Sequence, residues 1–401
     1  MTPDAQLARI RRRFVALTAL RWLPTGFAVP VLVLLLQERG IGLATIGVIV
    51  AAYSAATLLL ELPTGGLADT IGRRPVLVAA ALLSAVGSLI LAFGTVAWVL
   101  AGAYVIGGIA RALDSGPLQA WYVDSTHAVD PGASIRSGLS RAGVAESLGL
   151  AAGSLGAAAL VAVGPLAAPF LVAAGLSCIH GALVLAWVDE SGRGPAPSGG
   201  TMRGLASTVT SGLRVARSHP AIRRILLVMA AAGVGLSGLE LLAPPHFAAL
   251  LGGEDAAAGP YAVLVAAAFG GSALGAALAP AAAGWLRAPS RAAAAGVLTA
   301  GLLLAGVAVP LFGVAAVAFV AFYVPLGVAM PLVDELTHHA ASSGARATVL
   351  SLNSMALQGA AILATTGLGA LADATSSGAS LLVPAALLAA GALALTRWPE
   401  R

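Results

Sequence analysis

The chain contains no lysine, and all 22 of its basic residues are arginine. The phosphate-binding loop GxxxxGK[ST] requires a lysine that reaches the nucleotide phosphates, so the chain cannot contain this loop. Cysteine is nearly as scarce, because Cys178 is the single one and lies in an apolar run. A disulfide framework and a cysteine metal cluster are therefore excluded. No Ser/His/Asp set, HExxH pair or cluster of carboxylates stands out, so we expect no enzyme, no metal site and no cofactor.

Charged residues make up only 10% of the chain, whereas an average soluble domain has about 25%. Hydrophobic residues reach 59%, and the mean hydropathy is +0.93. This composition predicts a polytopic membrane protein embedded in a lipid bilayer. The net charge of +5 comes from arginines in short loops and at the ends, which membrane topology explains, so we expect no nucleic-acid partner.

Long apolar runs divide the chain into membrane spans. About 20 apolar residues are needed to cross roughly 30 Å of hydrocarbon. Runs of this kind predict twelve helices, at residues 14–36, 42–62, 76–94, 97–120, 141–163, 166–188, 224–247, 260–284, 292–308, 311–333, 347–370 and 379–396.

The positions of the arginines predict the orientation. If the amino terminus is cytoplasmic, the arginines outside the spans fall on the inner side with the exception of Arg39. Arg21 and Arg111 fall within spans. We therefore expect a protein of the inner cell membrane with both termini in the cytoplasm. The basic cluster before the first span is expected to precede a retained helix, because that run is too long for a signal peptide.

A polar interruption divides the spans into two sets of six. It begins with SGRGPAPSGG, a flexible linker composition. We expect a six-helix bundle over residues 1–189, a cytoplasmic linker over 190–222 and a second bundle over 223–401. Residues 205–216 place apolar side chains on one helical face, which fits either a helix on the membrane surface or a solvated linker helix.

The two halves resemble each other. A shift of 210 residues brings Val123 and Asp124 onto Val333 and Asp334, and Arg136 onto Arg346. An internal repeat of this kind predicts two pseudo-symmetric bundles. In transporters built from such repeats, the substrate site lies at the interface of the halves near the middle of the membrane.

The segment GGLADTIGRRPVL, residues 65–77, is a short charged loop between two apolar runs. Asp69 can accept hydrogen bonds, Gly72 permits a tight turn, and Arg73 and Arg74 supply forked donors. With Gly65, these residues are typical of a latch or hinge. Asp124, at the end of the fourth span, is placed to attract Arg73. Asp334 and Arg346 are expected to form the counterpart in the second half; ordinary solvated loop charges are the alternative.

The spacing of Gly65, Asp69, Gly72, Arg73 and Arg74 resembles the loop 2–3 signature of the major facilitator superfamily, with Thr70 where the family usually has a basic residue. Together with the spans, the repeat and the central linker, the resemblance covers essentially the whole chain. It implies an all-α fold of twelve helices, alternating access, and a cavity lined by helices 1, 4, 7 and 10.

Few charges lie within the spans, where a charge costs about 2.5–3.5 kcal/mol and needs a partner or a use. Arg111 and Asp114, three residues apart, are expected to pair on one helical face. Their segment RALDSGPLQAW resembles a loose form of the helix 4 arginine motif of proton-linked drug exporters. These two residues either function in the cavity or form a structural ion pair.

Three further charges are candidates for substrate binding or proton coupling. Arg21 either binds an anionic group or extends to the lipid headgroups. Glu146 is expected to pair with Arg111 or Arg21. Glu240 has no basic residue near it in sequence, so it is either a proton carrier or a carboxylic acid hydrogen-bonded to the backbone near Pro244.

These features predict a monomeric secondary transporter that exports small amphipathic or hydrophobic molecules in exchange for protons. The spans expected to line the cavity contain few polar residues, which favours apolar cargo over sugars. The alternatives are an importer or uniporter of a small metabolite and a non-transporting receptor or scaffold. A membrane enzyme or a channel is less favoured, because neither a catalytic set nor a filter-like polar span is found.

Overall fold

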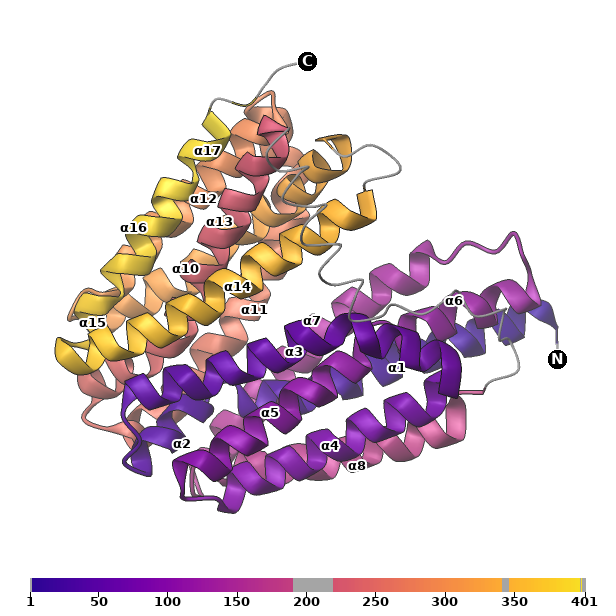
Figure 1. The fold of residues 1–401 in the computed structure, drawn as a ribbon, viewed down its shortest axis with the longest axis horizontal. Coiled ribbons are helices and arrows are strands. Elements are labelled where there is room, and N and C mark those ends of the chain that lie inside the picture. The colour runs from indigo at the N-terminus through magenta and orange to yellow at the C-terminus, as the bar shows by residue number, and fades with distance from the viewer. Residues whose placement is uncertain (1, 190–218, 341–345, 397, 399–401) are drawn as a thin grey trace. The chain divides into compact units, whose positions relative to one another are not determined.

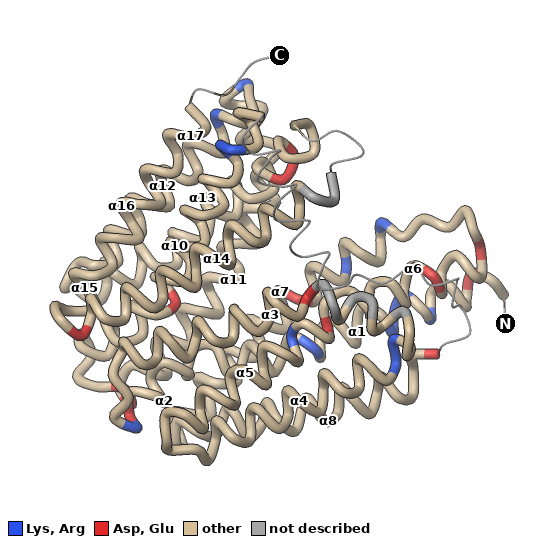
Figure 2. Tube along the Cα trace, in the orientation of Figure 1, with Lys and Arg blue, Asp and Glu red and all other residues tan. Residues whose placement is uncertain are grey.

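A computed structural model describes residues 2–189, 219–340, 346–396 and 398, with the side chains at 62, 63, 65, 66, 69 and 346–348 left undescribed. Every regular element within these ranges is a helix (Figure 1). Twelve stretches of the described chain are long and apolar enough to cross a membrane, as the sequence predicted. Charged residues are sparse along these stretches (Figure 2).

The helices form two compact units. The first contains α1 (Pro3–Ala28), α4 (Arg73–Phe93), α5 (Ala97–Asp114), α6 (Pro117–Val129), α7 (Arg136–Val161) and α8 (Ala168–Trp187). The second contains α2 (Leu32–Glu38), α10 (Pro220–Leu251), α11 (Glu254–Trp285), α12 (Pro289–Val307), α13 (Phe312–Ala340), α14 (Arg346–Ala374), α15 (Ser377–Ser380), α16 (Leu382–Gly391) and α17 (Leu393–Thr396).

Helix α3 (Leu43–Ile71) belongs to both units. Residues Leu32–Ala55 group with the second unit, although they precede the predicted linker, and the part of α3 from Ala56 onward groups with the first. The division at residues 1–189, 190–222 and 223–401 stays a prediction. Residues 190–218, which include the predicted surface helix, lie outside the described residues.

Close backbone contacts hold the first unit together. Helix α1 packs on α7 and α8, and α4 packs on α5 and α8 (Figure 1). A Cβ added to Gly26 would lie 2.4 Å from the carbonyl oxygen of Leu150, and one added to Gly153 would lie 2.4 Å from that of Leu23. Only glycine therefore allows α1 and α7 to approach this closely.

Aromatic rings occupy the core of the second unit, where α11 and α12 pack on α13, and α10 packs on α14. Phe247 lies 5.7 Å from Tyr261 and 5.8 Å from Phe319, measured between ring centroids. Large apolar side chains on the outer faces are exposed, such as Val317 at 71% and Leu363 at 77%. Exposure of this kind is expected where a helix faces lipid.

Two sequence predictions about helix boundaries were wrong. The predicted span 97–120 is interrupted, because α5 ends at Asp114 and α6 begins at Pro117. Gly116 has φ +98°, which glycine tolerates, and proline at the first position of α6 suits a new helix start. The segment 65–77 is not a loop: α3 runs to Ile71 and α4 begins at Arg73, so only Gly72, at φ +106°, separates them.

Candidate functional site

An ion pair inside the first unit forms the centre of the site. Nε of Arg21 in α1 donates a hydrogen bond to Oδ2 of Asp114, the last residue of α5. The two side chains are only 16% and 13% exposed, so the charges depend on each other rather than on bulk water. Oδ1 of Asp114 is buried and has no hydrogen-bond partner in the described chain. That oxygen remains able to accept a proton or a hydrogen bond.

The local helix geometry explains why Asp114 needs Arg21. A carboxylate at the carboxyl end of a helix faces the partial negative charge of the terminal carbonyl groups, which is unfavourable. Arg21 offsets this repulsion and connects α1 to α5 in one contact. The pairing of Arg111 with Asp114 expected from their spacing is therefore wrong, since the carboxylate of Asp114 pairs with Arg21.

Arg111 lies instead over an indole ring. Its Cζ is 4.9 Å from the centroid of the Trp22 ring, and Cζ of Arg21 is 4.6 Å from the same centroid. A guanidinium over an aromatic ring gains about 0.5–1 kcal/mol, and more where water is excluded. Trp22 thus holds two positive charges near the carboxylate of Asp114. Trp22 was not predicted from the sequence, although its position next to Arg21 was a usable signal.

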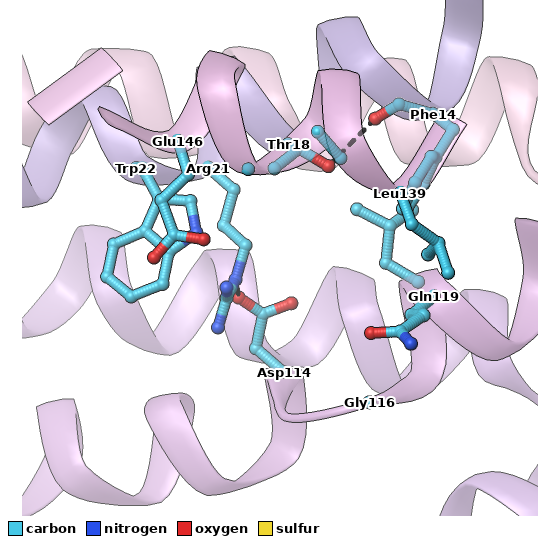
Figure 3. Close-up of a pocket in the computed structure, with 12 residues that line it drawn as sticks. Phe14, Thr18, Arg21, Trp22, Asp114, Gly116, Gln119, Leu139 and Glu146 are labelled. Carbon is cyan, nitrogen blue, oxygen red and sulfur yellow. Dashed lines mark hydrogen bonds and ion pairs between the residues drawn. The ribbon is translucent and has the colours of Figure 1, made fainter. Parts of the chain in front are cut away.

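Glu146 brings a second carboxylate to the cluster from α7. Its side chain is half-buried and interacts electrostatically with both Arg21 and Arg111, while the ion pair expected with one of them stays a prediction. Figure 3 shows its carboxylate beside Trp22 and Arg21. The cluster therefore combines two guanidinium groups with two carboxylates, and its formal charge balances when both acids are ionised.

A cavity of about 280 Å³ adjoins this cluster. It lies inside the first unit, and Figure 3 shows its lining from α1, α5, α6 and α7. Its polar lining comes from the charged groups together with Thr18 and Gln119, and its apolar lining includes Phe14, Leu118 and Leu139. A small molecule with one polar group and one apolar face matches such walls.

The Arg73–Asp124 pair predicted from the loop motif is present. Nη2 of Arg73, the first residue of α4, lies 2.5 Å from Oδ2 of Asp124 in α6. Arg74 donates to the backbone carbonyl of Leu185 in α8. Gly65 lies within α3, and the side chain of Asp69 is not described, so the expected orientation of Arg73 by Asp69 stays a prediction.

The second-half counterpart of this pair is only partly described. Asp334 is exposed near the end of α13 and interacts electrostatically with His338. The side chain of Arg346 lies outside the described residues. Their pairing therefore stays a prediction.

Glu240 lies in the second unit, in the middle of α10, and is exposed although the residues around it are buried. It interacts electrostatically with Tyr261 of α11 and Tyr323 of α13. Glu240 was predicted from the sequence as a candidate site residue, whereas the two tyrosines were not. In the described part of the chain, no group of three or more His, Cys, Asp or Glu side chains could hold a metal ion.

Asp373, near the end of α14, was not predicted from the sequence either. Its carboxylate accepts hydrogen bonds from the backbone N–H groups of Leu43 and Ala44, at 3.0 and 2.8 Å. Gly42, which precedes α3, has no side chain to cap this helix, and Asp373 acts as the cap from a distant helix. A contact across 330 positions leaves no local pattern in the sequence.

Comparison with known proteins gives one family and one fold. The model of the Major Facilitator Superfamily matches residues 14–365. No protein of curated function matches the chain in sequence.

Several solved structures share the fold. A mutant of the nucleoside transporter NupG has a TM-score of 0.80 at 13% identity, covering 98% of this chain and 100% of that one. A mutant of the peptide transporter POT has a TM-score of 0.75 at 15% identity, covering 98% and 97%. The human organic anion transporter MFSD10 (TETRAN) has a TM-score of 0.64 at 17% identity, covering 97% and 99%. At these identities the likeness establishes the fold alone.

Proposed function

The chain belongs to the Major Facilitator Superfamily of membrane transporters, and we propose that it exports small amphipathic or hydrophobic molecules in exchange for protons. The observation that carries the proposal is the Arg21–Asp114 ion pair beside a cavity within membrane-spanning helices. Charges at membrane depth are costly and usually belong to a substrate or proton pathway.

Proton coupling follows from the chemistry of the pair. Protonation of Asp114 removes the negative charge that holds Arg21, so α1 and α5 lose a contact when a proton binds. Glu146 provides a second carboxylate beside the same guanidinium groups. A proton that moves down the membrane potential supplies about 2.3 kcal/mol per 100 mV, which is enough to concentrate a cargo without a nucleotide.

Alternating access would use the Arg73–Asp124 pair as a latch. The pair joins the start of α4 to α6, and its rupture would accompany the opening of one side of the protein. We place this latch, both termini and the linker over 190–222 on the cytoplasmic side of the inner membrane, and we expect the monomer to be the transporting unit.

Uptake of a small polar metabolite is the second candidate. Thr18 and Gln119 give the cavity hydrogen-bonding groups that a purely apolar cargo would not use. Structures of the same fold include nucleoside and peptide transporters, although identities of 13–15% do not transfer their cargo to this chain.

The test is the internal pH of vesicles reconstituted with the full chain. Lipophilic cations, neutral amphipathic compounds, nucleosides and short peptides are added in turn to wild type, Asp114→Asn and Glu146→Gln. Asp130→Asn, in an exposed connection after α6, is the matched control. A rise in internal pH evoked by an added amphipathic compound and lost in Asp114→Asn supports exchange. A fall in internal pH evoked by nucleosides or peptides alone supports uptake, and transport without proton movement overturns the coupling.

A further inference from the structure

The charges at the cavity of the first unit cancel one another. Among the described residues that line it, Arg21, Asp114 and Glu146 are the charged ones, and by themselves they would leave one negative charge. Arg111 supplies the balancing positive charge, because its Cζ lies 4.9 Å from the centroid of the ring of Trp22, which also lines the cavity. With both acids ionised, the four groups have no net charge.

The Arg21–Asp114 pair leaves no counter-charge for an ionic ligand. A cation binds Asp114 only if it displaces Arg21, and that guanidinium, 16% exposed, then loses its partner. An anion that draws Arg21 away leaves the carboxylate of Asp114, 13% exposed, in the same position. Either ligand also gives up its own hydration on entry, which is costly for a charged group.

Glu146 lies beside positive charges. Figure 3 shows its carboxylate next to Trp22 and Arg21, and Cζ of Arg21 and of Arg111 lie 4.6 and 4.9 Å from the centroid of that ring. A cation that approaches Glu146 therefore also approaches two guanidinium groups, and an anion that approaches those groups also approaches two carboxylates. The cluster has no net attraction for either sign.

Gln119 is an uncharged polar group on the wall of the cavity. Its side chain is exposed and makes no hydrogen bond within the described chain, whereas the hydroxyl of Thr18 donates to the carbonyl of Phe14. A primary amide both donates and accepts, so Gln119 matches a hydroxyl or an amide of a ligand. Leu139, which is partly exposed and also lines the cavity, provides apolar surface.

We propose that the cavity binds uncharged molecules that carry a hydroxyl or amide group on an apolar body. The balanced cluster disfavours ions of both signs, Gln119 supplies the hydrogen bonds, and the apolar wall packs on the body of the molecule. A volume of about 280 Å³ restricts the cargo to a small molecule. This inference rests on the proposed export function, for which it narrows the cargo from amphipathic compounds in general to uncharged ones.

The experiment measures the binding of three probes to the full-length protein in lipid vesicles at pH 7. The probes share a phenyl group and differ in charge: 3-phenylpropan-1-ol is uncharged, 3-phenylpropylamine is a cation, and 3-phenylpropanoate is an anion. Binding to protein-free vesicles of the same lipid is subtracted, because the probes partition differently into the bilayer. The alcohol should bind about tenfold or more tightly than either ion. An ion that binds as tightly as the alcohol overturns the inference.

Two variants should change the preference in opposite directions. Arg111→Gln leaves one excess negative charge, so the affinity of the cation relative to the alcohol should rise about tenfold or more. Glu146→Gln leaves one excess positive charge and should do the same for the anion. Arg136→Gln, at the exposed start of α7, is the matched control and should keep the wild-type order. Folded Arg111→Gln and Glu146→Gln proteins that also keep this order would overturn the role of charge balance.

Gln119→Leu tests the hydrogen bond. In n-butylbenzene a methyl group replaces the hydroxyl of the alcohol probe, so the ratio of the two affinities reports the contact of that hydroxyl. This ratio should fall about two- to tenfold in Gln119→Leu, since a hydrogen bond between uncharged groups is lost. An unchanged ratio would exclude Gln119 as the partner of the hydroxyl.

Failure of this inference differs from failure of the export function. If an ion evokes the proton movement in the vesicle panel and the alcohol does not bind, export stands and the uncharged cargo is wrong. If the alcohol binds in the predicted order but no compound of the panel moves protons, the binding site stands and export is wrong.

Discussion

Asp114 accepts a hydrogen bond from Nε of Arg21 across 93 positions of the sequence. The pair joins α1 to the end of α5 beside a cavity, at a point where the chain breaks between two helices. Protonation of Asp114 would weaken this ionic contact and would therefore affect both α1 and α5.

Removal of one partner of this pair should destabilise the protein. Arg21→Leu removes the donor that binds the buried carboxylate of Asp114, and Asp114→Leu removes the acceptor for Nε of Arg21, so each should cost about 3–5 kcal/mol of unfolding free energy. The double variant should cost less than the sum of the two. Thermal or denaturant unfolding of the four proteins measures the coupling. The exposed Asp130→Asn, which keeps the oxygen that accepts from the N–H of Gly132, is expected within about 0.5 kcal/mol of wild type. If the double variant loses as much unfolding free energy as the two single variants together, Arg21 and Asp114 do not interact directly.

The Arg73–Asp124 pair should affect transport more than stability. Its side chains are 20% and 36% exposed, and ion pairs open to solvent contribute about 1 kcal/mol or less. Arg73→Asp and Asp124→Arg should each reduce the transport rate, and the charge-swapped double variant should recover part of it. A double variant no faster than the slower single variant would exclude a latch that depends on this attraction.

The glycine contacts between α1 and α7 predict that one added methyl group destabilises the protein strongly. Gly153→Ala would place a carbon 2.4 Å from the carbonyl oxygen of Leu23 and should cost about 1–3 kcal/mol. Gly175→Ala in α8 meets no atom within 4 Å and should stabilise the helix by about 0.5–1 kcal/mol. Unfolding of the two variants in parallel measures the difference; similar effects from both would refute the close approach.

Asp373 should hold the start of α3 against α14. Asp373→Ala removes the acceptor for the N–H groups of Leu43 and Ala44, and loss of a helix cap costs about 0.5–2 kcal/mol. Hydrogen exchange at the start of α3 should speed up, while exchange at the start of α11 should stay unchanged. Asp373→Asn, which retains one oxygen acceptor, should lie between wild type and Asp373→Ala. Unchanged exchange in Asp373→Ala would show that the cap contributes little.

The sequence predicted the number of spans because the length of an apolar run is set by the thickness of the bilayer. It did not predict that α3 continues to Ile71, since Asp69 ends the apolar run while the backbone hydrogen bonds of the helix continue. The turn at Gly72 was predicted, because glycine readily takes a positive φ.

Pairings were harder to predict than helices. The three-residue spacing of Arg111 and Asp114 within α5 allows a pair, but the carboxylate binds Arg21 of α1 and Arg111 lies over Trp22, and the spacing cannot predict such partners from another helix. The Arg73–Asp124 pair was found because a family motif pointed to it. Contacts such as Asp373 with Leu43 depend on how distant helices pack, which no local pattern records.

The most direct test of proton-coupled export is transport into vesicles that hold an imposed pH gradient. The cargo is the compound that evokes the largest proton movement in the vesicle panel, and wild type is compared with Asp114→Asn. Exchange predicts that the cargo accumulates when the lumen is acidic, because protons leave as the cargo enters, and that Asp114→Asn abolishes this accumulation. Accumulation with an alkaline lumen would indicate that protons and cargo move together. The proposed mechanism would be contradicted if the cargo equilibrates to the same level with and without the pH gradient. It would also be contradicted if Asp114→Asn transports as fast as wild type.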